Sequence, residues 1–131
     1  MAKYIRSISV IVPVFNEWGN IQQFHTEVVA SLLKAKKSFE IIYVDDYSSD
    51  GTYEWLLTVA DNTSVKVFRK SGVKGKAFSL IQGFNQASGD ALVMIDGDLQ
   101  YPPEKIPQMV TIPIDSILSV DSGQTICYLT K

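Results

Sequence analysis

Short β-branched, apolar runs alternate along the chain with longer stretches in which apolar residues recur at helical spacing. The runs at 7–15, 39–46, 64–70 and 90–96 predict strands, the first two of them buried on both faces. The stretches at 19–37, 50–62 and 74–88 predict the intervening helices. Strands and helices that alternate at this length are typical of βαβ units, so the pattern predicts an α/β protein with a mostly parallel sheet.

The predicted helices carry local signals of their own. The apolar positions of the first helix are Ile21, Phe24, Val28 and Leu32. Those of the third helix are Ala77, Leu80 or Ile81, Phe84 and Ala87. Asp50 is the expected cap at the start of the second helix.

The alternation stops at about residue 110. The segment 111–131 contains some strand-like residues but does not continue the pattern of strand and helix. We therefore assign residues 1–110 to one domain and treat 111–131 as a separate C-terminal tail.

The composition of the chain excludes several kinds of binding site. The 131 residues are 46% hydrophobic and 20% charged, which is ordinary for one globular domain. The net charge of -2 gives no basic field for nucleic acid. A single histidine, His25, and a single cysteine, Cys127, exclude an internal disulfide and a metal site built on several cysteines or a pair of histidines.

The start of the chain has basic residues before an apolar run, as a signal peptide does. Pro13 within the run and the lack of a small-residue cleavage site favour a strand instead. No apolar run approaches the roughly 20 residues that span a bilayer. We therefore expect a cytoplasmic protein.

Charged residues, together with a proline, a glycine, a phenylalanine and an asparagine, lie at or just after the carboxyl end of every predicted strand. They are Pro13, Phe15, Asn16 and Glu17; Asp45 and Asp46; Arg69, Lys70, Lys74 and Lys76; and Asp96, Gly97 and Asp98. Ligands of open parallel sheets bind beyond the carboxyl ends of the strands. The sequence thus predicts a binding site at one sheet edge, with acids from three strands and bases from one.

Asp96 and Asp98 flank Gly97 directly after the fourth strand. An isolated Asp-Gly turn is commonly no more than a solvated corner. In an extended segment, however, residues two apart point the same way, so both carboxylates could face one ion. Carboxylates without histidine or cysteine suit Mg²⁺ or Mn²⁺, which leave coordination positions open for phosphates.

The other polar residues allow two further interpretations, and two nucleotide-binding motifs are excluded. Asp45 and Asp46 are candidates to meet a ribose or base. The lysines of 70–76 either supply positive charge to phosphates or form a solvated loop. A P-loop is excluded because Lys70 stands at the first glycine and Ala77 at the Ser/Thr position, and no GxGxxG follows the first strand.

Four stretches together resemble family 2 glycosyltransferases of the GT-A fold. They are VIVPVFNE, VDDYSSDGT, GKAFSLIQGFNQASGD and MIDGDLQYPPEKIP. The last is most similar to the polyprenyl-phosphate branch, whose members use dolichyl or undecaprenyl phosphate. The resemblance covers residues 7–110 and implies a Rossmann-like sheet with helices on both faces, the nucleotide-sugar-binding half of the GT-A fold.

The resemblance also implies roles for residues on the nucleoside side of the site. Pro13, Phe15 and Glu17 match residues that line the nucleoside pocket. Asp46 matches the strand-end acid that contacts the base or ribose.

On the diphosphate side, Asp96 and Asp98 match the DxD motif that holds a divalent metal, Mg²⁺ or Mn²⁺. Gln100 matches a third residue near that metal, and Gly97 lies against the ribose and phosphate in the family. Lys76 matches more loosely, as a phosphate-side residue of a variable loop.

The implied function is inverting, metal-dependent transfer of a sugar from a UDP- or GDP-linked donor to a polyprenyl phosphate or a saccharide. A polyprenyl-phosphate acceptor would place the protein peripherally at the cytoplasmic face of a membrane. Family members continue beyond this point with an acceptor half, so we expect a truncated chain and assign no catalytic residue. The alternative is a non-catalytic donor-binding module. A sugar nucleotidyltransferase is a weaker alternative, because residues 15–17 stand where that class has a glycine-rich, basic loop.

The sequence does not determine the oligomeric state. An unpaired edge of the predicted sheet would favour self-association into a homo-oligomer.

Overall fold

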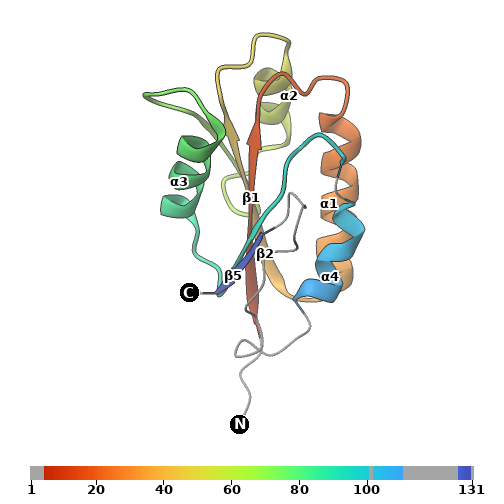
Figure 1. Cartoon of the computed structure of the whole chain (residues 1–131). Helices are drawn as coiled ribbons and strands as arrows, with labels where there is room; N and C mark the ends of the chain where they lie inside the picture. Colours follow the sequence, from red (N-terminus) through yellow and green to blue (C-terminus); the bar gives the residue numbers. More distant parts are fainter. Residues whose placement is uncertain (1–4, 101, 111–126, 131) are drawn as a thin grey trace.

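The predicted alternation of strands and helices is present in a computed structural model of the chain (Figure 1). It describes residues 5–100 and 102–110 and the backbone of 127–130. The elements are β1 Ser7–Val14, α1 Ile21–Ala35, β2 Ser38–Asp45, α2 Thr52–Val59, β3 Val65–Arg69, α3 Lys76–Gln86, β4 Ala91–Met94, the 3₁₀ turn η1 Pro103–Lys105, α4 Ile106–Met109 and β5 Cys127–Thr130. Within these residues, no helix has the length and hydropathy needed to cross a bilayer.

The strands form one sheet in the order β3-β2-β1-β4-β5. β1 pairs in parallel with β2 and β4, and β2 pairs in parallel with β3, which confirms the mostly parallel sheet. β5 joins the β4 edge antiparallel, with Met94 opposite Cys127. The sequence pattern did not predict β5, because four residues of weak alternation are placed by pairing with β4 and not by their own periodicity.

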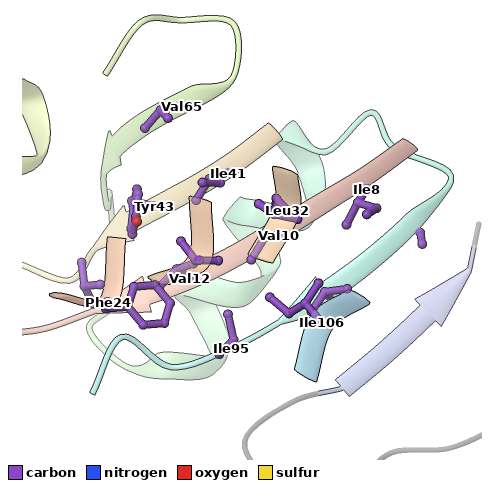
Figure 2. Close-up of a cluster of buried hydrophobic side chains, with 14 of the residues drawn as sticks. Ile8, Val10, Val12, Phe24, Leu32, Ile41, Tyr43, Val65, Ile95 and Ile106 are labelled. Atoms are coloured by element: carbon purple, nitrogen blue, oxygen red, sulfur yellow. The ribbon is translucent and has the colours of Figure 1, made fainter. Parts of the chain in front are cut away.

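Helices cover both faces of the sheet, as the resemblance implied. In Figure 1, α1 and α4 lie on one side of the strands and α3 lies on the other. Figure 2 shows the core beneath α1, where side chains from β1 and β2 meet those of Phe24 and Leu32. Each of these side chains is fully buried, and burying one apolar side chain of this size stabilises the fold by about 1.5–3 kcal/mol.

The face that α3 presents to the sheet differs from the expected apolar stripe. Ser79 and Gly83 are the buried residues of this helix, whereas Ala77 and Ile81 are exposed. A Cβ atom on Gly83 would lie 2.4 Å from Ile11 Cγ2, so only glycine allows this approach. The helix was therefore predicted correctly, but its sheet-facing side is small and partly polar.

The two ladders of β1 end at different points. β1 pairs with β2 as far as Val14 opposite Asp45, but it pairs with β4 only as far as Ile11 opposite Met94. Pro13 lies in the segment where β4 has already separated, so its missing amide N–H breaks no bond to that strand. The separation opens the carboxyl edge of the sheet between β1 and β4.

A buried carboxylate ties the opposite end of the sheet together. Glu40 Oε2 accepts hydrogen bonds from Ser9 Oγ and from the backbone and side chain of Ser88, and Lys66 Nζ donates to Oε1 at 2.8 Å. Burial alone would raise the pKa of Glu40. The hydrogen bonds outweigh burial and lower the pKa to about 2.

Replacing Glu40 should remove a pH-dependent part of the stability. Because the pKa falls from 4.5 to about 2 on folding, the ionised carboxylate stabilises the fold by about 3 kcal/mol above pH 4.5, and this is lost as pH falls toward 2. The difference in unfolding free energy between the native chain and Glu40→Gln should therefore shrink between about pH 5.5 and about pH 3. Urea unfolding across that range measures it.

The exposed Glu54 of α2 provides the matched control. Glu54→Gln should differ from the native chain by a small amount that stays flat over the same range. A Glu40→Gln difference that is equally flat would contradict the assigned network.

Candidate functional site

A pocket of about 360 Å³ opens at the carboxyl edge of the sheet, where β1 and β4 separate. It lies at the point where the strand order reverses, which is where ligands of open α/β sheets bind. Its lining residues are Pro13, Val14, Phe15, Glu17, Asp46, Lys76, Ser79, Asp96, Gly97 and Asp98. The eight residues that the family resemblance assigns to substrate binding therefore line one pocket, whereas Gln100, the third residue assigned to the metal, does not line it.

Asp46 reaches the pocket from the end of β2 and is fixed by two partners. Lys70 Nζ, only 2% exposed, lies 3.2 Å from Asp46 Oδ1, and the backbone N–H of Gly75 donates to Oδ2 at 2.9 Å. Lys70 also donates to the carbonyl of Gly75 at 2.6 Å. This buried pair clamps the loop before α3 against the end of β2.

Asp45 faces elsewhere and is not part of the pocket. Its Oδ2 accepts the backbone N–H of Ser48 at 2.9 Å and lies 3.5 Å from Arg69 Nε. Its other oxygen is buried and has no partner among the described residues. Of the two neighbouring acids, only Asp46 is placed to meet a ligand in the pocket.

The loop after β1 is held by side chains of the VDDYSSDGT stretch. Ser48 Oγ, Thr52 Oγ1 and Asp50 Oδ2 accept the backbone N–H groups of residues 16, 17 and 18 at 2.8, 3.0 and 3.1 Å. Asp50 precedes the N-cap residue Gly51, yet it also accepts the N–H of Thr52 at 3.0 Å. The stretch thus positions Phe15 and Glu17 at the pocket as well as starting α2.

One side of the pocket is built on the turn after β4. A Cβ atom on Gly97 would come within 3.1 Å of Val14 Cγ1, so the turn packs closely on β1. Asp98 Oδ1 accepts the backbone N–H of Gln100 at 3.0 Å, and Leu99 between them is left-handed with φ 66°. The contact of Gln100 is therefore through its backbone, and its predicted role near a metal stays a prediction.

Lys76 lies at the start of α3 and faces Asp96 across the pocket. Its Nζ lies 2.6 Å from one carboxylate oxygen of Asp96 and 2.7 Å from the other. The position of the ammonium shows that Asp96 presents both oxygens toward the cavity. A cation is already favoured at this point of the pocket.

Glu17 lines the pocket together with Asp46, Asp96 and Asp98. Burial raises the pKa of Glu17, a hydrogen bond from Asn20 opposes the rise, and the negative charges of Asp98, Asp50 and Asp96 add to it. The pocket therefore gathers more negative charge than its own groups neutralise, which favours a cation among them.

The rim carries an aromatic and a second lysine. Phe15 is 47% exposed although it lines the pocket, and Lys74 Nζ lies 4.6 Å from the centre of its ring. An exposed ring beside a cation is suited to stack on a planar base.

These donors fit a hard divalent cation bound together with phosphate. Among the described residues, no three His, Cys, Asp or Glu side chains gather closely enough to hold a metal by themselves. Asp96 and Asp98 supply hard oxygen ligands, and Mg²⁺ or Mn²⁺ bound by two carboxylates keeps further positions for water and phosphate.

Comparison with known proteins assigns the chain to a family. Residues 9–112 match the model of glycosyl transferase family 2. The chain belongs to this family. Its curated relatives include a dolichol-phosphate mannosyltransferase of Pyrococcus furiosus, 39% identical over 79% of this chain, and an undecaprenyl-phosphate 4-deoxy-4-formamido-L-arabinose transferase of Proteus mirabilis, 35% identical over 81%. The chain spans 29% and 33% of those proteins.

Solved structures confirm the fold. A mannosyltransferase from Pyrobaculum calidifontis in complex with GDP-Man and Mn²⁺ has a TM-score of 0.68 at 23% identity, over 84% of this chain and 33% of its own. Glucosyl-3-phosphoglycerate synthase from Mycobacterium tuberculosis, in complex with Mn²⁺, UDP and glucosyl-3-phosphoglycerate, has a TM-score of 0.61 at 26% identity, over 80% of this chain and 38% of its own. Both structures contain Mn²⁺ together with a nucleotide or a nucleotide sugar.

Sequence reasoning missed Val14 and Ser79 among the residues that line the pocket, and it did not predict that Lys70 is buried. Lys70 was counted among strand-end bases, but its burial follows from the parallel pairing of β2 and β3, which brings it beside Asp46. Ser79 follows Lys76 by three residues and precedes Gly83 by four, so small residues at helical spacing marked the sheet-facing side of α3.

Lys70→Met should destabilise the chain by about 3 kcal/mol, because it leaves Asp46 buried without its counter-charge. Urea unfolding measures the loss. Lys74→Met, which removes the same charge from an exposed position of the same loop, should change stability by less than about 0.5 kcal/mol. Equal losses in both variants would show that the Lys70–Asp46 pair does not hold the loop.

Proposed function

We propose that this chain binds a nucleoside-diphosphate sugar through a divalent metal, as the donor-binding part of a glycosyltransferase. The supporting observation is the pocket between β1 and β4, where three aspartates, a glutamate, a lysine and an exposed ring converge. Phe15 would stack on the base, with Asp46 and Glu17 beside the nucleoside. Asp96 and Asp98 would hold the metal, Mg²⁺ or Mn²⁺, against the diphosphate.

The proposed chemistry follows from where charge develops. When the bond between the sugar and the diphosphate breaks, negative charge builds on the departing nucleoside diphosphate. A divalent metal, when bound, stabilises that charge as a Lewis acid. Lys76 can add a charge-assisted hydrogen bond to the same oxygens. Gly97 lines the pocket and lets the turn that carries Asp96 and Asp98 pack closely on Val14 of β1.

The proposed acceptor is a polyprenyl phosphate, which is supported by the relatives named for dolichol and undecaprenyl phosphate. An oxygen of the acceptor phosphate would attack the anomeric carbon as the nucleoside diphosphate leaves on the opposite side, which inverts the configuration. A phosphate oxygen is already anionic near neutral pH, so this attack needs no group to remove a proton. Such a lipid acceptor would place the protein at the cytoplasmic face of a membrane.

Donor binding predicts a metal-dependent gain in thermal stability. Mn²⁺ together with GDP or UDP, at about 100 times the dissociation constant, should stabilise the fold by about 2.7 kcal/mol and raise the Tm by roughly 5–10 °C. Asp96→Asn and Asp98→Asn should each remove most of this rise, because each keeps the side-chain shape and loses a metal ligand. Differential scanning fluorimetry measures the rise.

Glu54→Gln is the control for a change of charge at an exposed residue that does not line the pocket, and it should keep the full rise. No rise with either nucleotide in the native chain would refute the proposed donor site. A rise that survives in both aspartate variants would refute the metal site alone.

Sugar transfer is a separate step, and the chain spans about a third of its relatives. The second candidate function is therefore donor binding without transfer. In a single-turnover assay with radiolabelled GDP-mannose or UDP-glucose and undecaprenyl phosphate, a transferase forms labelled lipid within one turnover. Saturable donor binding with no labelled lipid would instead support the donor-binding module.

A further inference from the structure

The carboxylate of Asp96 pairs with Lys76, and the same carboxylate is the proposed metal ligand. Lys76 Nζ contacts both oxygens of Asp96, at 2.6 and 2.7 Å. These are the oxygens that would have to bind a divalent metal under the proposed function. The ammonium and the metal therefore compete for the same ligand atoms.

The backbone of Lys76 is held in place, whereas its side chain has room to move. Gly75 precedes it with φ 131° and is bonded through its N–H to Asp46 and through its carbonyl to Lys70. The side chain of Lys76 is 54% exposed, but that of Asp96 is only 16% exposed. The ammonium can therefore leave Asp96 and remain at the pocket, while Asp96 stays where it is.

An empty pocket needs this counter-charge. Glu17, Asp96 and Asp98 all line the pocket, and the charges of Asp96 and Asp98 contribute to the raised pKa of Glu17. Lys76 is the only cationic side chain among the residues that line the described pocket. Without it, these acids would face one another with no positive charge among them.

We propose that Lys76 is an exchangeable counter-ion, which neutralises Asp96 while the pocket is empty and transfers to the donor diphosphate when the metal takes its place. The proposal rests on the proposed donor site. Metal alone must displace the lysine, whereas metal with a diphosphate offers the lysine a new partner. Lys76 therefore makes the pocket bind metal and nucleotide together in preference to metal alone.

Two measurements on Lys76→Gln test the exchange. Titration with Mn²⁺ alone, followed by the electron paramagnetic resonance signal of free Mn²⁺, should show about three- to fivefold tighter binding than in the native chain, because a partly exposed ion pair no longer opposes the metal. Calorimetric titration with GDP and UDP at saturating Mn²⁺ should show about fivefold weaker binding, because the diphosphate loses one charged donor. The opposite signs distinguish exchange from a general loss of structure.

Two further variants isolate the ion pair. Lys34→Gln removes the same charge from an exposed position of α1 that does not line the pocket, so its effect on Mn²⁺ affinity measures net charge alone and should stay below about twofold. Lys76→Arg keeps a cation opposite Asp96 and should restore both affinities to within about twofold of the native values. The melting temperature of each variant without ligand confirms folding, since Lys76 is half exposed.

The outcomes separate this inference from the proposed function. If Lys76→Gln tightens Mn²⁺ binding no more than Lys34→Gln, or if nucleotide affinity is unchanged, the exchange is refuted while the donor site stands. If arginine fails to restore the native affinities, the exchange is likewise refuted. If no variant binds Mn²⁺ and Mn²⁺ with nucleotide leaves the melting temperature unchanged, both proposals fall together.

Discussion

The early end of the β1–β4 ladder is the constraint on which the candidate site depends. Beyond Ile11 and Met94 the two strands separate, while β1 continues beside β2 to Val14. The helices on either side of this point lie on opposite faces of the sheet, α1 on one and α3 on the other (Figure 1). The resulting crevice is open to solvent at the strand ends, and residues from β1, β2, β4 and α3 reach it. Pro13, which would weaken a fully paired central strand, fits because β4 has already separated.

Two ion pairs involve acids of this crevice, one of them buried and the other partly exposed. Lys70 and Asp46 form a buried pair whose desolvation offsets much of its attraction, so its main contribution is to fix the loop before α3. Lys76 and Asp96 form a more exposed pair, which water screens and a ligand can replace. The buried pair holds Gly75 and hence the start of α3. The exposed pair can then exchange partners without disturbing the fold.

Much of this arrangement could be predicted from the sequence, and the exceptions have physical causes. The pocket residues were found because parallel strands end at a common edge, so acids that follow β1, β2 and β4 had to meet. Local pattern could not show that Lys70 is buried, because its burial depends on β3 lying beside β2. The packing side of α3 was misjudged because Gly83 allows close approach to Ile11 and Ser79 is buried on the same helix, which hydropathy does not register. β5 depends wholly on a partner strand.

Left-handed residues follow the strands that meet at the pocket. Asn16, Tyr47 and Leu99 have φ values of 50°, 64° and 66°, and each costs about 1 kcal/mol or more unless its surroundings hold it. The surroundings do so: Asn16 bonds to Ser48 and Ser49 through its N–H and side-chain oxygen, and Tyr47 donates to the carbonyl of Gly72. The side chain of Leu99 packs against the core. The bonds that hold the turns at Asn16 and Tyr47 all lie within residues 16–72. The turns proposed to meet the donor are therefore held by contacts from neighbouring loops at the same edge of the sheet.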